Sequence, residues 1–511
     1  MPEHIRALII ILGLSIPTFF LMKRMTASVI SSEQFNRWSM TWISVTLIAF
    51  LSGNFWVYVL LTGLLLLYVG KKEQNPFALF FMLLFTIPRI NQNIPGFGLV
   101  NFLFSVDYVT VLSLTILLPA YLSLRKLPDI KPFLSYTTDK ILLVYLVLDT
   151  MLLIRGTTFT DVMRSAVFNY TDVFLPYYVA SRSIRNLQQL KEVIIALVLA
   201  SMLAGVIALY EYAQFWLLYA QLAPALGVTW DLGLYLNRGE NLRALASLGQ
   251  PIVLGYALMV ALGCYFYMAK TVNNKLLMII GFCLLIGGLY APLSRGPWVG
   301  AALLVIFFIA ISPKAIRHFT ILFVTLLALI PIVKDTPMGI KIADMLPFIG
   351  KVDIENVEYR MDLVDNTIIL FNRNPFFGSV TYLQDLADLG MVQGAGIVDV
   401  VNSYLASVLR NGLVGVTLFI VFFGIILASV TKSLIRIPDK NSDIHLLGRV
   451  ILSCIVAMLV TIISVSSILI IPILYWTFAG LGLSFSRLVK GYKTQDYEVE
   501  LLPTIRLANK S

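Results

Sequence analysis

The 511-residue chain is 59% hydrophobic and only 13% charged, a composition that excludes a soluble multidomain protein. Its formal net charge of +10 is carried mostly by Lys and Arg in short loops between apolar runs, so no nucleic-acid partner is predicted. Apolar windows of about 19 residues recur from end to end and predict a lipid bilayer as a partner. The expected fold is an all-α polytopic membrane protein with about 12–14 transmembrane helices and one large extracytoplasmic loop carrying short helices.

Taken in chain order, the apolar runs predict a series of membrane-spanning helices. They lie at residues 6–22, 40–70, 76–88, 106–123, 139–154, 163–181, 192–213, 251–269, 275–291, 297–312, 317–333, 412–431, 446–466 and 468–486. The first is expected to be a retained anchor, because no small-residue cleavage site follows it. Residues 40–70 form either one long kinked helix or two short helices around "SGNFW", which leaves the sidedness of the N-terminus open.

The predicted spans divide the chain into five regions. These are N-terminal transmembrane helices (1–230), transmembrane helices with arginine-bearing outer loops (231–333), a large extracytoplasmic loop (334–411), C-terminal transmembrane helices (412–487) and a cytoplasmic tail (488–511). The basic loops all fall on one side of the spans, which we take as cytoplasmic. His4, His318 and His445 then belong to cytoplasmic-side segments. No histidine remains for an outer base or metal site, and no cofactor or metal is expected.

Six arginines are predicted to lie in outer loops, on the side where positive charge is disfavoured. They are Arg89, Arg155, Arg238, Arg243, Arg295 and Arg360. Each alone is compatible with a snorkelling anchor at the headgroup boundary. Together they favour convergence on an anionic ligand, because the planar guanidinium can grip phosphate or carboxylate oxygens in a bidentate manner.

The large outer loop also supplies carboxylates. The stretch "DIENVEYRMDLVDN" surrounds Arg360 with acids, which can simply keep the loop solvated. Asp399 and Asn402 follow in "GIVDVVNSYL", three residues apart and hence on one face of a predicted helix. They are either helix caps at the membrane surface or a carboxylate and an amide at the mouth of a cavity.

Four stretches resemble the O-antigen ligase/polymerase superfamily of bacterial envelope glycan assembly. They are "LYAPLSRGPWVGAALLVIF", "RALASLGQPIVLGYAL", "YRMDLVDNTIILFNRNPFFG" and "VNSYLASVLRNGLVGVTLF", and the resemblance covers about residues 230–430. It implies metal-independent, inverting glycosyl transfer from a polyprenyl-diphosphate-linked oligosaccharide donor, of undecaprenyl type, to a glycan acceptor. It also implies a bacterial cytoplasmic (inner) membrane, with the active site facing the periplasm or the cell exterior.

The resemblance assigns roles to individual residues. Arg295 and Arg360 are expected to be catalytic, because cations that hold the diphosphate stabilise the charge that develops as it leaves. Ligases usually carry a histidine before the Asn of "HNxYL", where this chain has Val401. Asp399 is therefore the first candidate for the general base, and an acid of the 353–362 cluster the second. The predicted substrate-binding residues are Arg243, Arg238, Arg89, Arg155, Asn402, Tyr404 and Asp362.

The missing histidine favours one branch of the superfamily. We expect a polymerase of exopolysaccharide, capsule or O-antigen repeat units rather than an O-antigen ligase to lipid A core. The main rival is a transporter or flippase for lipid-linked oligosaccharides, although the two related halves typical of transporters are not evident. A membrane scaffold without chemistry is a third interpretation, but it would not need outer arginines. A chain-length regulator or export machinery is a further expected partner.

Overall fold

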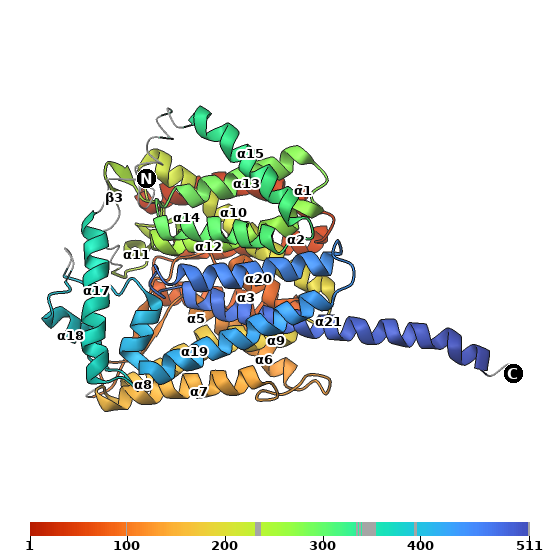
Figure 1. The fold of residues 1–511 in the computed structure, drawn as a ribbon. Coiled ribbons are helices and arrows are strands. Elements are labelled where there is room, and N and C mark those ends of the chain that lie inside the picture. Colours follow the sequence, from red (N-terminus) through yellow and green to blue (C-terminus); the bar gives the residue numbers. More distant parts are fainter. Residues whose placement is uncertain are drawn as a thin grey trace.

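In the computed structural model, the apolar runs form helices that lie side by side between two ends of one bundle (Figure 1). One end carries α17 (Ile354–Arg373) and α18 (Tyr382–Asp388), and we call it the α17 end. The opposite end carries the basic loops, and we call it the basic end. The residues described by the structure are 1–98, 100–229, 237–333, 336, 339, 354–392 and 396–508.

Among the described residues, six helices are long and apolar enough to cross a membrane. They are α1 (Glu3–Thr26), α3 (Phe55–Lys72), α10 (Leu187–Gln214), α12 (Pro251–Thr271), α19 (Ser403–Arg436) and α20 (Asp443–Thr461). Further helices of the bundle are α13 (Lys275–Tyr290), α14 (Arg295–Ala310) and α15 (Ala315–Val333). The predicted all-α polytopic membrane fold is confirmed.

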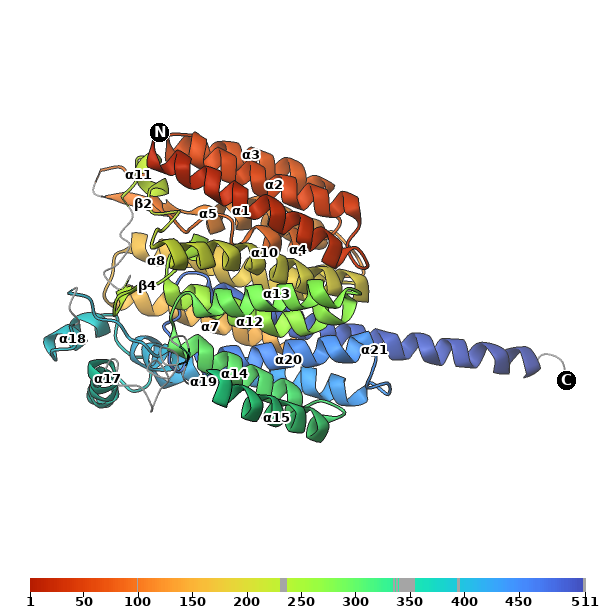
Figure 2. The same cartoon turned by 90° about the horizontal axis from the view of Figure 1, so that it is seen from above.

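The predicted span at 40–70 is two separate helices, α2 (Ser32–Leu51) and α3. Asn54 starts α3 afresh, because its side chain accepts hydrogen bonds from the first backbone N–H groups of the new helix. Because residues 32–72 form two helices instead of one, α1 begins at the α17 end (Figure 2). There, Trp216 Nε1 donates to Glu3 Oε1 at 3.0 Å. The prediction that His4 shares a side with the other two histidines is therefore wrong.

Residues 76–183 form shorter elements than predicted. The span expected at 76–88 is helical only over α4 (Pro76–Leu83), and an antiparallel hairpin of β1 (Gln92–Pro95) and β2 (Phe102–Val106) follows it. Two later segments contain π-helical stretches, which bring side chains out of the usual helical register. The elements are α5 (Tyr108–Leu112), η1 (Ser113–Leu117), α6 (Leu118–Leu124), α7 (Thr137–Leu152), η2 (Leu153–Arg155), α8 (Phe159–Phe168), η3 (Asn169–Phe174) and α9 (Leu175–Ser183).

The large loop contains a longer helix than the short helices that were predicted for it. α17 spans 20 residues, and α19 begins at Ser403, inside the predicted loop. Gly412 breaks α19 with φ 65° and ψ −167°, so the long apolar part of the helix starts only after it. A Cβ atom at Gly412 would lie 2.3 Å from the carbonyl carbon of Phe376, so a side chain is excluded there.

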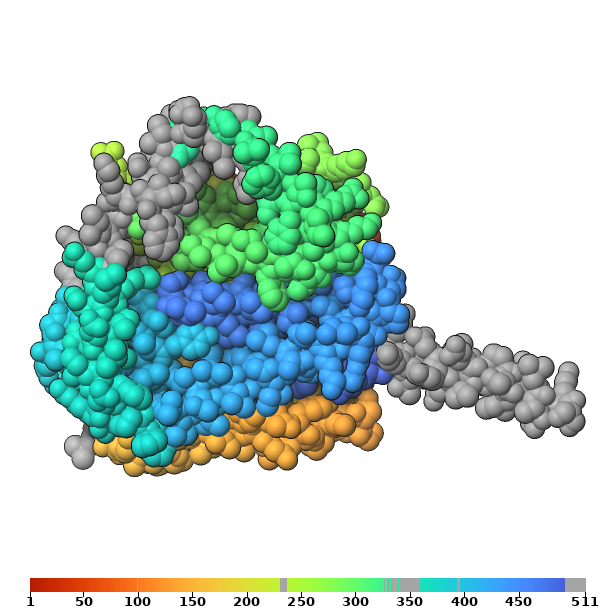
Figure 3. Space-filling model, viewed as in Figure 1, coloured from red at the N-terminus to blue at the C-terminus, as the bar shows by residue number. Residues whose placement is uncertain are grey.

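The "NPFFG" segment of the large loop packs against α19 at its break. Leu413 N donates to Pro375 O at 2.8 Å, and Ser379 N donates to Leu409 O at 2.7 Å. A small separate core supports this contact, and Figure 3 shows α17 lying across the end of α19. The core consists of Leu363, Leu370, Leu386, Met391, Val400 and Leu409. Two of the quoted motifs thus pack against each other and fix the α17 end.

The two last spans meet differently from the prediction. α20 ends at Thr461 and α21 (Ile471–Ala508) begins at Ile471, which leaves a loop of residues 462–470 that we call the α20–α21 loop. α21 also continues as a helix beyond the predicted end at 486. At the basic end, Lys191 and Lys270 donate to the carboxylate of Asp443 at 2.6 and 2.9 Å, which ties α10 and α12 to α20.

Candidate functional site

A short hairpin places two of the predicted arginines against the turn between α13 and α14. Arg238 donates to the carbonyl oxygen of Leu293. Arg243 donates from Nε to Pro292 O at 3.1 Å and from Nη2 to Ser294 Oγ at 3.0 Å. Carbonyl and hydroxyl oxygens orient a guanidinium without adding a formal negative charge. The hairpin consists of β3 (Asn237–Arg238) and β4 (Asn241–Leu242).

A buried carboxylate holds the segment that carries Arg243. Glu211, in the last turn of α10, accepts hydrogen bonds from the backbone N–H groups of Leu218, Leu245 and Ala246 at 3.0, 2.9 and 2.7 Å. Hydrogen bonds from N–H groups to a carboxylate are among the stronger ones in proteins. The position of Arg243 is therefore fixed from inside the bundle.

Arg295 is the first residue of α14. The side chain of Ser294 makes no capping hydrogen bond, so the N-terminal amides of α14 add their positive dipole to the same region. A Cβ atom on Gly296 would lie 3.1 Å from Ser464 Oγ and from Val465 Cγ2. Glycine at this position therefore lets the start of α14 approach the α20–α21 loop closely.

Arg360 reaches the same loop from α17. Its Nη2 donates to Ser464 O at 3.4 Å. Burial lowers the pKa of the Arg360 guanidinium; the charge of Asp399 opposes this shift, and the charge of Arg238 adds to it. Both groups are thus close enough to act on Arg360 electrostatically. We call Arg238, Arg243, Arg295 and Arg360 the arginine cluster, since all four border the α13–α14 turn or the α20–α21 loop.

The other two predicted arginines have different partners. Arg89 donates to Asp107 at 2.6 Å and to Asp172 at 2.8 Å, and its side chain is only 9% exposed. Arg155 donates to the carbonyl oxygen of Phe377 at 2.8 Å, across the "NPFFG" segment. Arg89 and Arg155 therefore contact other segments than the α13–α14 turn and the α20–α21 loop.

Asp399 and Asn402 do not share a helical face, because both precede the first residue of α19. Asp399 Oδ1 accepts a hydrogen bond from Ser466 Oγ at 2.8 Å. Asn402 caps α19, and its Oδ1 accepts from the backbone N–H groups of Tyr404 and Leu405 at 2.9 and 3.2 Å. The capping alternative is therefore the one observed for Asn402, whereas Asp399 faces the α20–α21 loop.

The remaining predicted site residues are placed as follows. The hydroxyl of Tyr404 donates to Leu459 O at 3.0 Å, which positions its ring between α19 and α20. Glu358 and Asp362 are exposed on α17. Asp353, another acid of the predicted cluster, lies outside the described residues. Among the described acids named as candidate bases, Asp399 is the one that lines a cavity.

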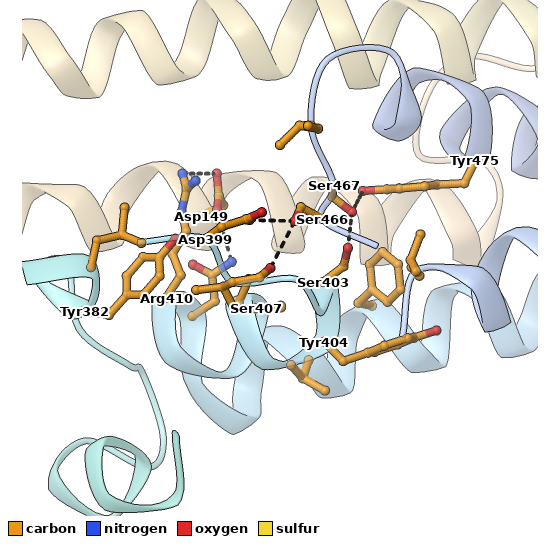
Figure 4. A pocket seen from close by; sticks show the side chains of 18 of the residues that line it. Asp149, Tyr382, Asp399, Ser403, Tyr404, Ser407, Arg410, Ser466, Ser467 and Tyr475 are labelled. Atoms are coloured by element: carbon orange, nitrogen blue, oxygen red, sulfur yellow. Dashed lines mark hydrogen bonds and ion pairs between the residues drawn. The ribbon is translucent and has the colours of Figure 1, made fainter. Parts of the chain in front are cut away.

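A cavity of about 300 Å³ lies beside Asp399, between α19, α7 and the α20–α21 loop (Figure 4). We call it the Asp399 cavity. Burial raises the pKa of the Tyr382 hydroxyl, which lines this cavity. The polar side chains around the cavity include Asp149, Asp399, Tyr404, Ser407, Arg410 and Tyr475.

Sequence reasoning missed the second carboxylate of this cavity. Asp149 accepts from Arg410 Nη2 at 3.1 Å, from Asn411 Nδ2 at 3.0 Å and from Asn169 Nδ2 at 3.1 Å. A signal was present, because Asp149 is a lone acid within the apolar run "VYLVLDTMLL". An ionisable residue inside a predicted span is by default a candidate functional residue.

The geometry of the site can be compared with known proteins. Residues 280–420 match the model of the O-antigen ligase family, and the matched segment contains Arg295, Arg360, Asp399 and Arg410. A comparison with curated proteins finds no match. Within the described residues, no three His, Cys, Asp or Glu side chains are grouped as metal ligands would be. The predicted resemblance to the O-antigen ligase/polymerase superfamily is confirmed for residues 280–420, the part of the chain that matches the O-antigen ligase family.

Proposed function

We propose that the protein transfers an oligosaccharide from a polyprenyl diphosphate to a glycan acceptor, with inversion at the anomeric carbon and without a metal ion. The observation that carries this proposal is the arginine cluster beside Asp399. Guanidinium groups of the β3–β4 hairpin donate to the α13–α14 turn, that of α17 donates to the α20–α21 loop, and Arg295 begins α14 where the turn and the loop approach each other. A diphosphate offers several oxygens and two or more negative charges, which such a cluster is suited to bind.

Arg295 and Arg360 are proposed to contact the diphosphate, with Arg238 and Arg243 in support. Burial lowers the pKa of Arg360, and the nearby charge of Arg238 lowers it further, so these two cations repel each other. A bound diphosphate would relieve this repulsion. The same cations would stabilise the negative charge that grows on the diphosphate as the bond to the sugar breaks.

Asp399 is proposed as the general base. The oxygen of an acceptor hydroxyl attacks C1 of the donor sugar, its proton passes to Asp399, and the C1–O bond breaks so that the electron pair leaves with the diphosphate. Asp149 is less suited to this role. Three hydrogen-bond donors already hold its carboxylate, and taking up a proton would weaken those bonds.

We propose a polymerase of exopolysaccharide, capsule or O-antigen repeat units, because Val401 stands where ligases carry a histidine. The position of the arginine cluster favours transfer over transport. Arg295 and Arg360 lie at the α17 end of the bundle, whereas transporters hold substrates near the bilayer midplane. The active site is proposed to face the periplasm or the cell exterior of a bacterial inner membrane, with a chain-length regulator or export machinery as a further partner.

An elongation assay tests the proposal. Purified protein in detergent, given an undecaprenyl-diphosphate oligosaccharide and no nucleotide or metal, is expected to form longer lipid-linked glycans. Arg295→Ala and Arg360→Ala should each lower the rate by roughly 100-fold or more, because each removes a cation that stabilises the leaving group. Arg317→Ala, an exposed arginine at the basic end, is the matched control and should keep the wild-type rate.

Two results would contradict the proposal. Transbilayer movement of the donor in vesicles without any elongation would identify a transporter instead. Equal rates in all three variants, with unchanged thermal unfolding, would show that the arginine cluster has no part in the reaction.

A further inference from the structure

A second cavity, of about 540 Å³, lies between the β1–β2 hairpin and α8. We call it the hairpin cavity. Three aromatic rings line it, those of Phe102, Phe104 and Phe168, and Asn91 and Ser105 are among its polar side chains. Its volume falls within the range of roughly 300–1,000 Å³ that is usual for ligand pockets. The proposed diphosphate site makes no use of it.

The charges in the wall of the hairpin cavity are largely neutralised by one another. Arg89 is held between Asp107 and Asp172, and Arg164 pairs with Asp161. Such a wall has little net attraction for a diphosphate, unlike the arginine cluster. Aromatic faces combined with amide and hydroxyl groups suit an uncharged sugar, because the rings pack against its C–H face and the polar groups bind its hydroxyls.

The hairpin cavity lies next to the Asp399 cavity. Arg410 lines both of them. The α20–α21 loop contacts the arginine cluster, Asp399 and both cavities. Its contacts are Ser464 at the arginine cluster, Ser466 at Asp399, Ile468 in the Asp399 cavity and Leu469 in the hairpin cavity.

The contacts that connect the arginine cluster, through Asp399 and Arg410, to the hairpin cavity bear on the proposed reaction. In an inverting transfer, the attacking hydroxyl approaches the donor sugar from the face opposite the leaving group. The acceptor sugars must therefore lie beyond Asp399 as seen from the arginine cluster, and the hairpin cavity begins there. We propose that the hairpin cavity binds the acceptor glycan through the sugar units next to the attacking hydroxyl, with Phe104 as a stacking surface and Asn91 as a hydrogen-bonding group. The inference rests on the proposed function.

Binding of lipid-free sugar tests this assignment directly. Oligosaccharides of one to three repeat units, released by mild acid from the donor used for elongation, are titrated into the purified protein by calorimetry. Phe104→Ala and Asn91→Ala should each weaken binding by about tenfold, as truncation of a central contact does. Phe97→Ala is the matched control, because Phe97 lies between the two strands of the same hairpin with 83% of its surface exposed. Its affinity should equal that of the wild type.

Kinetics separate the acceptor from the donor. In elongation with the lipid-free oligosaccharide added as a separate acceptor, Phe104→Ala should raise the KM for that oligosaccharide and leave the KM for the lipid-linked donor unchanged. A rise in the donor KM alone would overturn the assignment, since the cavity would then hold donor sugars. Equal affinity of all variants for the oligosaccharides, with normal elongation, would also overturn it while leaving the proposed function intact. Absence of elongation by the wild-type protein would instead contradict the proposed function.

Discussion

Two groups of arginines at the α17 end show how the same residue type serves different purposes. Arg89 lies between Asp107 and Asp172, two carboxylates on other segments, and is 9% exposed. In the arginine cluster, Arg360 of α17 donates to the main-chain carbonyl oxygen of Ser464. Carboxylates neutralise a guanidinium, whereas carbonyl groups only orient it.

The difference teaches that exposure to the outer side is not enough to identify a ligand-binding arginine. A buried arginine held by two acids is part of the framework, and its removal leaves buried charge behind. Arg360 donates to a backbone oxygen and lies near Arg238, so it contributes a positive field that a ligand can use. We therefore expect substitutions in the two groups to affect different properties, stability in one and turnover in the other.

The largest effect on turnover is expected at Asp399. Asp399→Asn should lower the rate of elongation by roughly 100- to 10,000-fold, because an amide cannot take the proton of the acceptor hydroxyl. Thermal unfolding should be nearly unchanged, and so should binding of the donor. Elongation at the wild-type rate would show that Asp399 is not the general base, and Asp149 would then be the next residue to test.

Substitutions in the ion-pair network of Arg89, Asp107 and Asp172 should lower stability rather than turnover. Asp172→Asn removes one of two carboxylates from a buried ion-pair network and is expected to destabilise the protein by about 3–5 kcal/mol, measured by unfolding in detergent. Asp388→Asn, on α18 of the large loop, serves as a control. If Asp172→Asn kept full stability and lost donor binding instead, the division of the arginines into two groups would be wrong.

A smaller effect is expected where the loop docks on α19. Gly412→Ala forces a methyl group into the backbone of Phe376 at a positive φ, and should cost about 1–3 kcal/mol of stability. Gly424→Ala is the matched control, because Gly424 lies in the same helix and a Cβ atom added there would meet nothing within 4 Å. Equal stability of the two variants would show that the contact between the "NPFFG" segment and α19 is dispensable.

The smallest effect is expected at Ser466. Ser466→Ala removes the hydroxyl that donates to Asp399, and we expect elongation to slow by about tenfold, the usual effect of losing a hydrogen bond to a charged group. Ser466→Thr keeps a hydroxyl and should restore most of the rate. Failure of threonine to restore activity would indicate that Ser466 acts through packing.

The sequence predicted those parts of the site that are carried by local motifs. Arg295, Arg360 and Asp399 were identified from short patterns, and the structure places each of them at the α20–α21 loop or the segment packed on it. The extent of the loop was missed. The predicted spans ended at 466 and resumed at 468, because the apolar residues of "IISVSSILII" continue the hydrophobic pattern of the flanking helices and do not mark all of residues 462–470 as non-helical.

Other features depend on contacts between distant segments. Arg89 and Asp172 are 83 positions apart, and their pairing could not be derived from spacing. The π-helical stretch η3 brings Asn169 toward Asp149, but one extra residue in a helical turn leaves no trace in an apolar pattern. The break at Gly412 depends on the backbone of residues 375–379, which packs beside it, and this contact could not be derived from either segment alone.

Affinity for the lipid carrier alone tests the central claim most directly. Polyprenyl diphosphate and polyprenyl monophosphate, both without sugars, are compared for binding to the purified protein. The wild type is expected to prefer the diphosphate by roughly tenfold or more, because two phosphates can engage more guanidinium groups. Arg295→Ala and Arg360→Ala should lose this preference, while Arg317→Ala should retain it. The same preference in all of these variants would contradict the account.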